Sequence, residues 1–178
     1  MRRTDHGRTS PEIRPVAVPP DLAAAAGLPR PDFADGFAAR LPRGAPTDLD
    51  FWHDAVLRTS APAWLSGLMR VRGALARLLR LKTAGGESDN LFPVLSRTHA
   101  VLVSGVDDRH LDFRVVITVP TLPGAGCELV VVTVVQRHNL VGRAYFALVR
   151  PFHRRVVPAL MRRAVRSGAP GPAAPAER

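Results

Sequence analysis

The chain has 178 residues, 46% of them hydrophobic, and a formal net charge of +10. This length suits one domain with a substantial core, since domains of roughly 100 to 150 residues are the commonest size. The composition excludes a wholly disordered chain, and the single cysteine, Cys127, excludes an intramolecular disulfide and a cysteine-ligated metal cluster.

Both ends of the chain are rich in proline and poor in apolar patterning. We expect residues 1–31 to form a disordered arm and residues 167–178 a disordered tail, on either side of a single domain over residues 32–166. The first residues lack the apolar core of an export signal, and no stretch approaches the roughly 20 apolar residues of a membrane span. We therefore expect a cytoplasmic protein without a transmembrane segment.

The first half of the domain predicts a strand followed by two helices. Apolar residues on alternate positions over residues 33–41 predict a short edge strand. Thr47 and Asp50 resemble the start of a helix, which should continue through Leu57. Residues 62–80 place apolar side chains at helical spacing, with arginines away from them, and predict a second, amphipathic helix. The strand positions are Phe33, Asp35, Phe37, Ala39 and Leu41.

The second half carries a strong β signal. Three valine-rich runs, Val94–Val106, Arg109–Val119 and Cys127–Gln136, are separated by turn residues. Short connections favour antiparallel pairing of these runs. In the second run, one face should join the core and the other should not. The predicted core face contains Leu111, Phe113, Val115 and Ile117, and the opposite face contains His110, Asp112 and Arg114.

The last predicted element is a long helix over residues 140–166, with Pro151 and Pro158 inside it. We expect a kink at Arg150–Pro151, because proline removes a backbone donor. Residues 140–168 contain seven arginines and no acidic residue, which indicates either a solvated helix face or a surface that attracts anionic partners. The predicted buried side contains Val141, Tyr145, Leu148, Phe152 and Val156, and the opposite side contains Arg143, Arg150 and Arg154.

Four runs, at residues 107–114, 133–139, 142–145 and 150–154, together resemble a bacterial family of unknown function, numbered 2867. The resemblance spans about residues 32–166 and implies no established activity. It implies a relation to helix-grip (START-like) domains, an α+β class in which an antiparallel sheet wraps around a long C-terminal helix. Here two N-terminal helices would complete the fold.

The same resemblance has implications for ligands and partners. Helix-grip domains often enclose an apolar cavity for a lipid, sterol, polyketide or aromatic ligand, and some members of the family are fused to a reductase-like domain. This chain has no glycine-rich strand-to-helix fingerprint for a dinucleotide. We therefore expect no cofactor, and any reductase-like partner would be a separate protein.

Several polar residues are candidates for chemistry. His110 and Asp112 on one strand face could act as a general acid and base, or form a structural ion pair at the strand edge. Together with His138 and His153 they have the ligand types of a zinc or iron site, but no helical ligand pair is present. We expect no metal site, and we assign no role to Cys127.

Our leading hypothesis is a non-catalytic domain that binds a small apolar or amphipathic ligand between the sheet and the C-terminal helix. The alternatives are an acid/base enzyme of cyclase, isomerase or hydrolase type that uses His110 and Asp112, and an accessory module for a reductase-like partner. Nucleic-acid binding is not expected, because exposed aromatic residues are lacking, whereas peripheral contact with an anionic membrane is compatible with the arginine-rich helix. The predicted walls of the ligand site are Trp64, Leu68, Phe113, Val115, Tyr145 and Phe152, with His110, Arg114, His138 and Arg143 as its polar rim.

Overall fold

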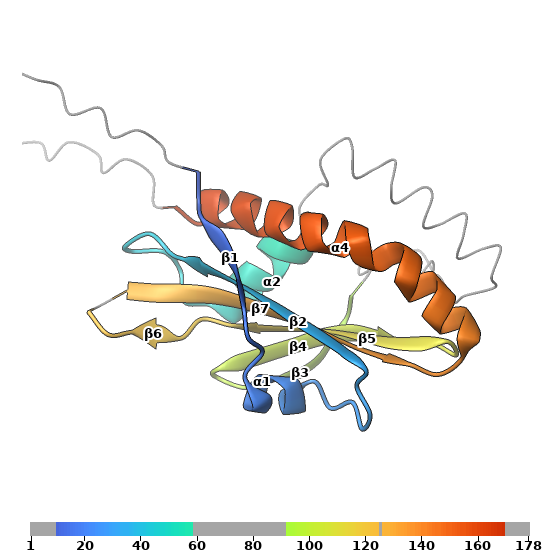
Figure 1. Ribbon diagram of the computed structural model, residues 1–178. Coiled ribbons are helices and arrows are strands. Elements are labelled where there is room, and N and C mark those ends of the chain that lie inside the picture. The colour runs from blue at the N-terminus through green and yellow to red at the C-terminus, as the bar shows by residue number, and fades with distance from the viewer. Residues whose placement is uncertain (1–9, 59–91, 125, 170–178) are drawn as a thin grey trace, which may run out of the picture.

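The computed structural model of the chain describes residues 10–58, 92–124 and 126–169. Seven strands form an antiparallel sheet in the order β1-β2-β7-β5-β4-β3, with β6 paired to β7, and the long helix α4 lies across one face of it (Figure 1). The predicted α+β class with a helix-grip-like arrangement is confirmed. The strands are β1 (Ile13–Val16), β2 (Phe33–Arg40), β3 (Val94–Arg97), β4 (Val101–Asp107), β5 (Leu111–Thr118), β6 (Thr121–Leu122) and β7 (Gly126–Arg137), and the helices are α1 (Pro20–Ala25), α2 (Leu49–Leu57) and α4 (Leu140–Ser167).

The sheet carries an apolar layer on each face. On one face, which we call the inner face, strand residues pack against α2 and α4. On the opposite, outer face they pack against α1. The central strand β7 is buried on both faces, which explains its nearly continuous run of valines. The inner core includes Phe37, Trp52, Val115, Ile117, Val131 and Met161, and the outer core includes Leu22, Ala26, Val103, Val116 and Val132.

The prediction of a disordered arm over residues 1–31 is wrong for the part of the arm that the structure describes. Residues Ile13–Val16 form β1, which pairs antiparallel with β2, and α1 places Leu22 in the outer core. Pro20 opens α1, where the fixed φ angle and missing N–H of proline suit the first helical turn. As a consequence, β2 lies between β1 and β7 and is not the predicted edge strand.

The first predicted helix is confirmed as α2, but its cap differs. The N-cap is Asp48 and not the predicted threonine: its Oδ1 accepts the backbone N–H of Asp50 at 3.1 Å. Trp52 is fully buried, and its Nε1–H donates to the carbonyl oxygen of Pro46 at 2.8 Å. These bonds fix α2 on the inner face. The second predicted helix, over residues 62–80, lies outside the described residues.

The three β runs are confirmed as strands, but their boundaries differ from the prediction and His110 lies outside β5. The run Val94–Val106 forms two strands, β3 and β4, because Thr98 makes a turn between them: its Oγ1 accepts the N–H of Val101 at 3.0 Å. In β5, the side chains of Phe113 and Ile117 belong to the inner core, as predicted.

Helix α4 ends one residue beyond the predicted boundary, at Ser167, and bends along its length with both prolines inside it (Figure 1). The predicted buried side is wrong in part, because Leu148 and Phe152 are 49% and 38% exposed. The buried stripe lies on the adjacent flank and includes Gly142, Phe146, Val157 and Met161. The predicted tail lies mostly outside the described residues.

Candidate functional site

The turn between β4 and β5 docks on the junction between β7 and α4. Asn139 is the N-cap of α4, and its Oδ1 accepts the N–H of Gly142 at 3.1 Å. Its Nδ2 donates to the carbonyl oxygen of Arg109 at 3.2 Å, and His138 N donates to the carbonyl oxygen of His110 at 2.9 Å. The start of α4 is therefore tied to the β4–β5 turn by side-chain and backbone bonds.

His110 is an integral part of this junction. Its ring is buried, and Nδ1 lies 3.0 Å from Asn139 Oδ1, which can only accept, so Nδ1 carries the proton. Its Nε2 faces the guanidinium of Arg109, with Arg109 Nη2 at 3.3 Å. Both ring nitrogens are thus engaged. His110 therefore contacts both the N-cap of α4 and the β4–β5 turn.

Asp112 is not paired with His110 as the sequence suggested. Its Oδ2 lies 3.0 Å from Nε2 of His138, and its Oδ1 accepts the N–H of Asp108 at 3.2 Å. The alternation of strand side chains predicted a shared face, but His110 precedes β5 and belongs to the turn. The carboxylate therefore orients a different imidazole, whose side chain is one-third exposed.

Two basic rim candidates lie away from the inner face. Arg114 is buried on the outer face, where Nη2 contacts Asp107 Oδ1 at 2.5 Å and Nη1 donates to the carbonyl oxygen of Val106 at 3.3 Å. Arg114 of β5 therefore links the two strands of the β4–β5 hairpin near the end of β4. Arg143 is exposed on α4. Neither side chain is placed between the sheet and the helix.

The candidate metal ligands do not converge. His110 contacts Asn139, His138 contacts Asp112, and His153 contacts Asp35. Within residues 10–58, 92–124 and 126–169, no three histidine, cysteine, aspartate or glutamate side chains form a group that could hold a metal ion. Asp112 and His138 share one contact, and His110 and His153 each belong to another.

Polar side chains interrupt the apolar inner face along one line across the strands. Asp35 of β2 is opposite Thr133 of β7, and Val115 of β5 is opposite both Thr133 and Ser104 of β4. Directly opposite residues of antiparallel strands share a face, and Val115 lies in the inner core. Asp35, Thr133 and Ser104 therefore all lie on the inner face, and we call these three residues the polar row.

The polar row contains buried oxygen atoms without partners. Ser104 is 0% exposed and Thr133 is 2% exposed. The atoms Ser104 Oγ and Asp35 Oδ2 are buried and have no hydrogen-bond partner among the described residues. Strand spacing places the two ends of the row about 14 Å apart. Leaving such a group unsatisfied costs about 1–3 kcal/mol, so each oxygen calls for an explanation.

Helix α4 contributes a basic group to one end of the polar row. Nε2 of His153 donates to Oδ1 of Asp35 at 3.1 Å, and the two side chains are 11% and 20% exposed. The imidazole also meets the ring of Phe33 edge to face, with 6.3 Å between centroids. Arg150 covers the same phenylalanine ring at 5.4 Å from its centroid, and Phe146 packs against it at 4.7 Å. An aromatic pair, Phe33 and Phe146, therefore lies beside His153.

The predicted wall residues are distributed unequally. Val115 is buried in the inner core, and Phe113 packs beside that core, where its ring lies 5.4 Å from that of Phe92. Tyr145 is buried on α4, whereas Phe152 is partly exposed on the flank of the helix. Trp64 and Leu68 lie outside the described residues. Among the described wall candidates, Phe113 and Val115 lie on the same sheet face as the polar row.

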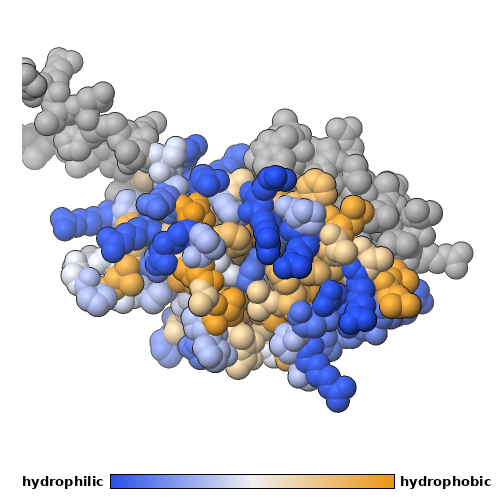
Figure 2. Space-filling view, viewed as in Figure 1, coloured by the Kyte–Doolittle hydropathy of each residue, from blue (hydrophilic) through white to orange (hydrophobic). Residues whose placement is uncertain are grey.

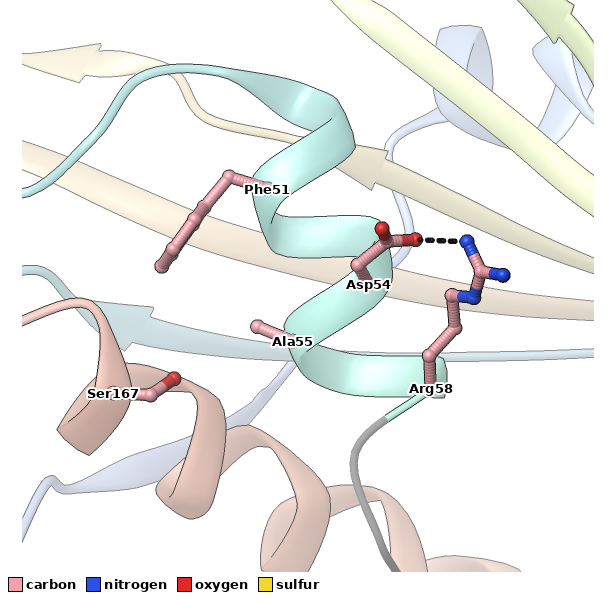
Figure 3. A pocket seen from close by; sticks show the side chains of 5 residues that line it. All are labelled: Phe51, Asp54, Ala55, Arg58 and Ser167. Atoms are coloured by element: carbon pink, nitrogen blue, oxygen red, sulfur yellow. Dashed lines mark hydrogen bonds and ion pairs between the residues drawn. The ribbon is translucent and has the colours of Figure 1, made fainter.

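A separate open pocket of about 370 Å³ lies between α2 and the end of α4. Figure 3 shows its lining residues, including Phe51 and Ser167, on the two helices. Asp54 and Arg58 pair at its rim, 3.5 Å apart. The pocket lies at the opposite end of α4 from the junction, in a position that the sequence did not predict. It offers one aromatic ring and little enclosure.

The sequence contained one signal for the Asp35–His153 pair. Asp35 stands in an otherwise apolar alternating series, the pattern of a strand whose face is buried. A carboxylate at such a position should have a partner from another element. The identity of that partner depends on how α4 crosses the sheet, which no local pattern specifies.

The arginines of α4 are interspersed with apolar residues on its surface. Figure 2 shows hydrophilic and hydrophobic side chains alternating along the helix, and Leu140, Leu148 and Phe152 are exposed between the arginines.

No helix in the described part of the chain is long and apolar enough to span a membrane.

Comparison with known proteins gives one match. A family model described as "Protein of unknown function (DUF2867)" matches residues 28–160, which contain β2, α2, β3 to β7 and most of α4. No curated protein matches the chain, and no solved structure matches it.

Proposed function

Because the chain belongs to the DUF2867 family, whose description assigns no activity, we propose from its geometry that it binds a small amphipathic ligand on the inner face of the sheet. The observation that supports this proposal is the polar row, with buried and unpartnered oxygens at Asp35 and Ser104. A mostly apolar surface with a few fixed polar groups is the usual form of a small-molecule site. The apolar part of the ligand would contact Phe113 and Val115, which share this face.

The packing of α4 supports a position for the proposed site. Its C-terminal part fills the inner core with Val157, Met161, Ala164 and Val165. Its N-terminal part buries Tyr145 and Phe146, which are not members of that core, and its middle brings His153 to Asp35. We therefore place the ligand beneath the N-terminal part of α4.

Occupancy is tested first on the full chain, purified without detergent. Organic extraction followed by mass spectrometry should recover a compound in a constant ratio to the protein. An uncharged apolar dye such as Nile red should bind the extracted, refolded protein and be displaced by the recovered compound. Repeated recovery of an empty protein that also fails to bind the dye would contradict the proposal.

The location is tested with two variants that add one methylene each. Val115→Ile extends into the inner face, and Val116→Ile extends into the outer face from the next residue of the same strand. Because one buried methylene corresponds to about 0.8 kcal/mol, Val115→Ile should change dye affinity by about threefold or more, and Val116→Ile should leave it unchanged. An effect confined to Val116→Ile would place the site on the outer face and contradict the proposal.

A second candidate function is acid/base catalysis by Asp112 and His138. It is favoured by the 3.0 Å contact between Asp112 Oδ2 and His138 Nε2, which would orient a partly exposed imidazole. The test compares hydrolysis of a p-nitrophenyl ester by His138→Asn and by a control, His99→Asn, at an exposed histidine. Loss of turnover in the first variant alone is expected if the pair is catalytic. Equal rates in both variants would refute this role.

A further inference from the structure

We propose that the inner-face site selects ligands whose polar end is a hydroxyl group over ligands that end in a carboxylate. This inference rests on the proposed function and concerns the Asp35 end of the polar row. An ionised carboxylate only accepts hydrogen bonds. Asp35 Oδ1 already accepts from His153, whereas the buried Oδ2 has no partner in the described part of the chain. The ligand group that satisfies Oδ2 must therefore donate.

Thr133 supplies the complementary half of this recognition. It is directly opposite Asp35 in the register of β2 and β7, so the two Cβ atoms are about 4.5–5.5 Å apart on the same face. Its hydroxyl can donate as well as accept. A ligand hydroxyl between the two residues can donate to Asp35 Oδ2 and accept from Thr133, so that both its donor and its acceptor have a partner.

A carboxylate at the same position meets the opposite electrostatic situation. It has no proton to donate, and it would bring a second negative charge beside Asp35. The basic group that faces the Asp35 carboxylate is His153, which already contacts Oδ1 of Asp35. The nearby Arg150 guanidinium lies over the ring of Phe33. Like charges in a poorly hydrated site disfavour the complex, so an anionic ligand end should be rejected.

The test uses the full chain and two probes with the same apolar chain, 1-octanol and octanoate. Calorimetric titration at neutral pH should show that octanol binds at least about tenfold more tightly, the difference expected for one hydrogen bond to a charged group. Asp35→Asn should reduce this preference to about threefold or less, because the amide carries no charge and can donate to a carboxylate. Asp32→Asn, at a surface carboxylate paired with Arg137, is the matched control and should keep the full preference.

A second variant serves if Asp35→Asn does not fold. Thr133→Val keeps the shape of the side chain and removes its hydroxyl, so it should weaken octanol binding and leave octanoate binding unchanged. Equal affinities for the two probes, or tighter binding of octanoate, would overturn the selection of a hydroxyl and leave the ligand site in place. Failure of both probes and of the uncharged dye would instead overturn the proposed function.

Discussion

The two ends of α4 meet the same sheet in different ways. Toward its C-terminus, Met161 and Val165 pack with Trp52 of α2 on strand residues such as Ile117, and this region is apolar and buried. Toward its N-terminus, the helix is capped by Asn139, tied to the β4–β5 turn, and paired through its only histidine with the polar row. The first region resembles an ordinary protein core, and the second contains polar groups in positions where a core would exclude them.

This difference separates two tasks within one interface. Apolar packing at the C-terminal end stabilises the fold, since burial of apolar area is the dominant favourable term in folding. The unpartnered oxygens of Ser104 and Asp35 reduce stability and are retained in the fold. Functional sites commonly carry groups that are unfavourable for folding. The contrast supports the proposal that one end of the helix stabilises the fold and the other end binds a ligand.

The largest effect should come from a cavity in the apolar end. Met161→Ala removes a side chain that is 0% exposed, and it should lower the free energy of unfolding by about 2–5 kcal/mol. Leu148→Ala, at a position 49% exposed toward the other end, is the control and should cost less than about 1 kcal/mol. Urea unfolding followed by circular dichroism measures both, and equal losses would contradict the division of tasks.

An intermediate effect is expected at the junction. A Cβ atom on Gly142 would collide with the carbonyl oxygen of His110, so Gly142→Ala should lower the free energy of unfolding by about 1–3 kcal/mol. On an unobstructed helix the same replacement should stabilise by about 0.5–1 kcal/mol. The exposed neighbour Ala144 provides the control, because Ala144→Gly should lower the free energy of unfolding by only about 0.5–1 kcal/mol. A rise in the thermal midpoint of Gly142→Ala would show that the turn is not docked on the helix.

The smallest effect has the most informative sign. Ser104→Ala removes a buried hydroxyl without a partner, so it should leave the free energy of unfolding unchanged or raise it by up to about 1 kcal/mol. Thr118→Val removes a buried hydroxyl that donates to the carbonyl oxygen of Ala100 at 2.7 Å, and it should lose about 1 kcal/mol. Chemical unfolding compares the two. If Ser104→Ala lowers the free energy of unfolding as much as Thr118→Val does, Ser104 has a structural partner.

The sequence predicted elements better than it predicted contacts. Periodicity located α4 and the faces of β5, because these patterns follow directly from helix and strand geometry. It chose the wrong flank of α4, with Leu148 and Phe152 turned inward, because two adjacent flanks of this helix are apolar. Only the crossing of the helix over the sheet decides which flank is buried, and that crossing is a tertiary property.

In the candidate site too, the sequence predicted local elements better than contacts. His110 and Asp112 are two residues apart, which on a regular strand places them on one face, but His110 lies in the turn and the pair does not form. Asp35 and His153 are 118 residues apart and contact each other. Proline content also misled the prediction at the N-terminus, since Pro20 starts α1. Long-range contacts and the local context of turns were the missing information.

The most direct test of the account is an amide NMR titration of the full chain with 1-octanol. Chemical-shift changes should concentrate at Asp35, Ser104 and Thr133 and at the neighbouring Phe113, with little change at Phe51 and Ser167 of the open pocket. Changes centred on Phe51 and Ser167, or no saturable changes at all, would contradict a ligand site on the inner face.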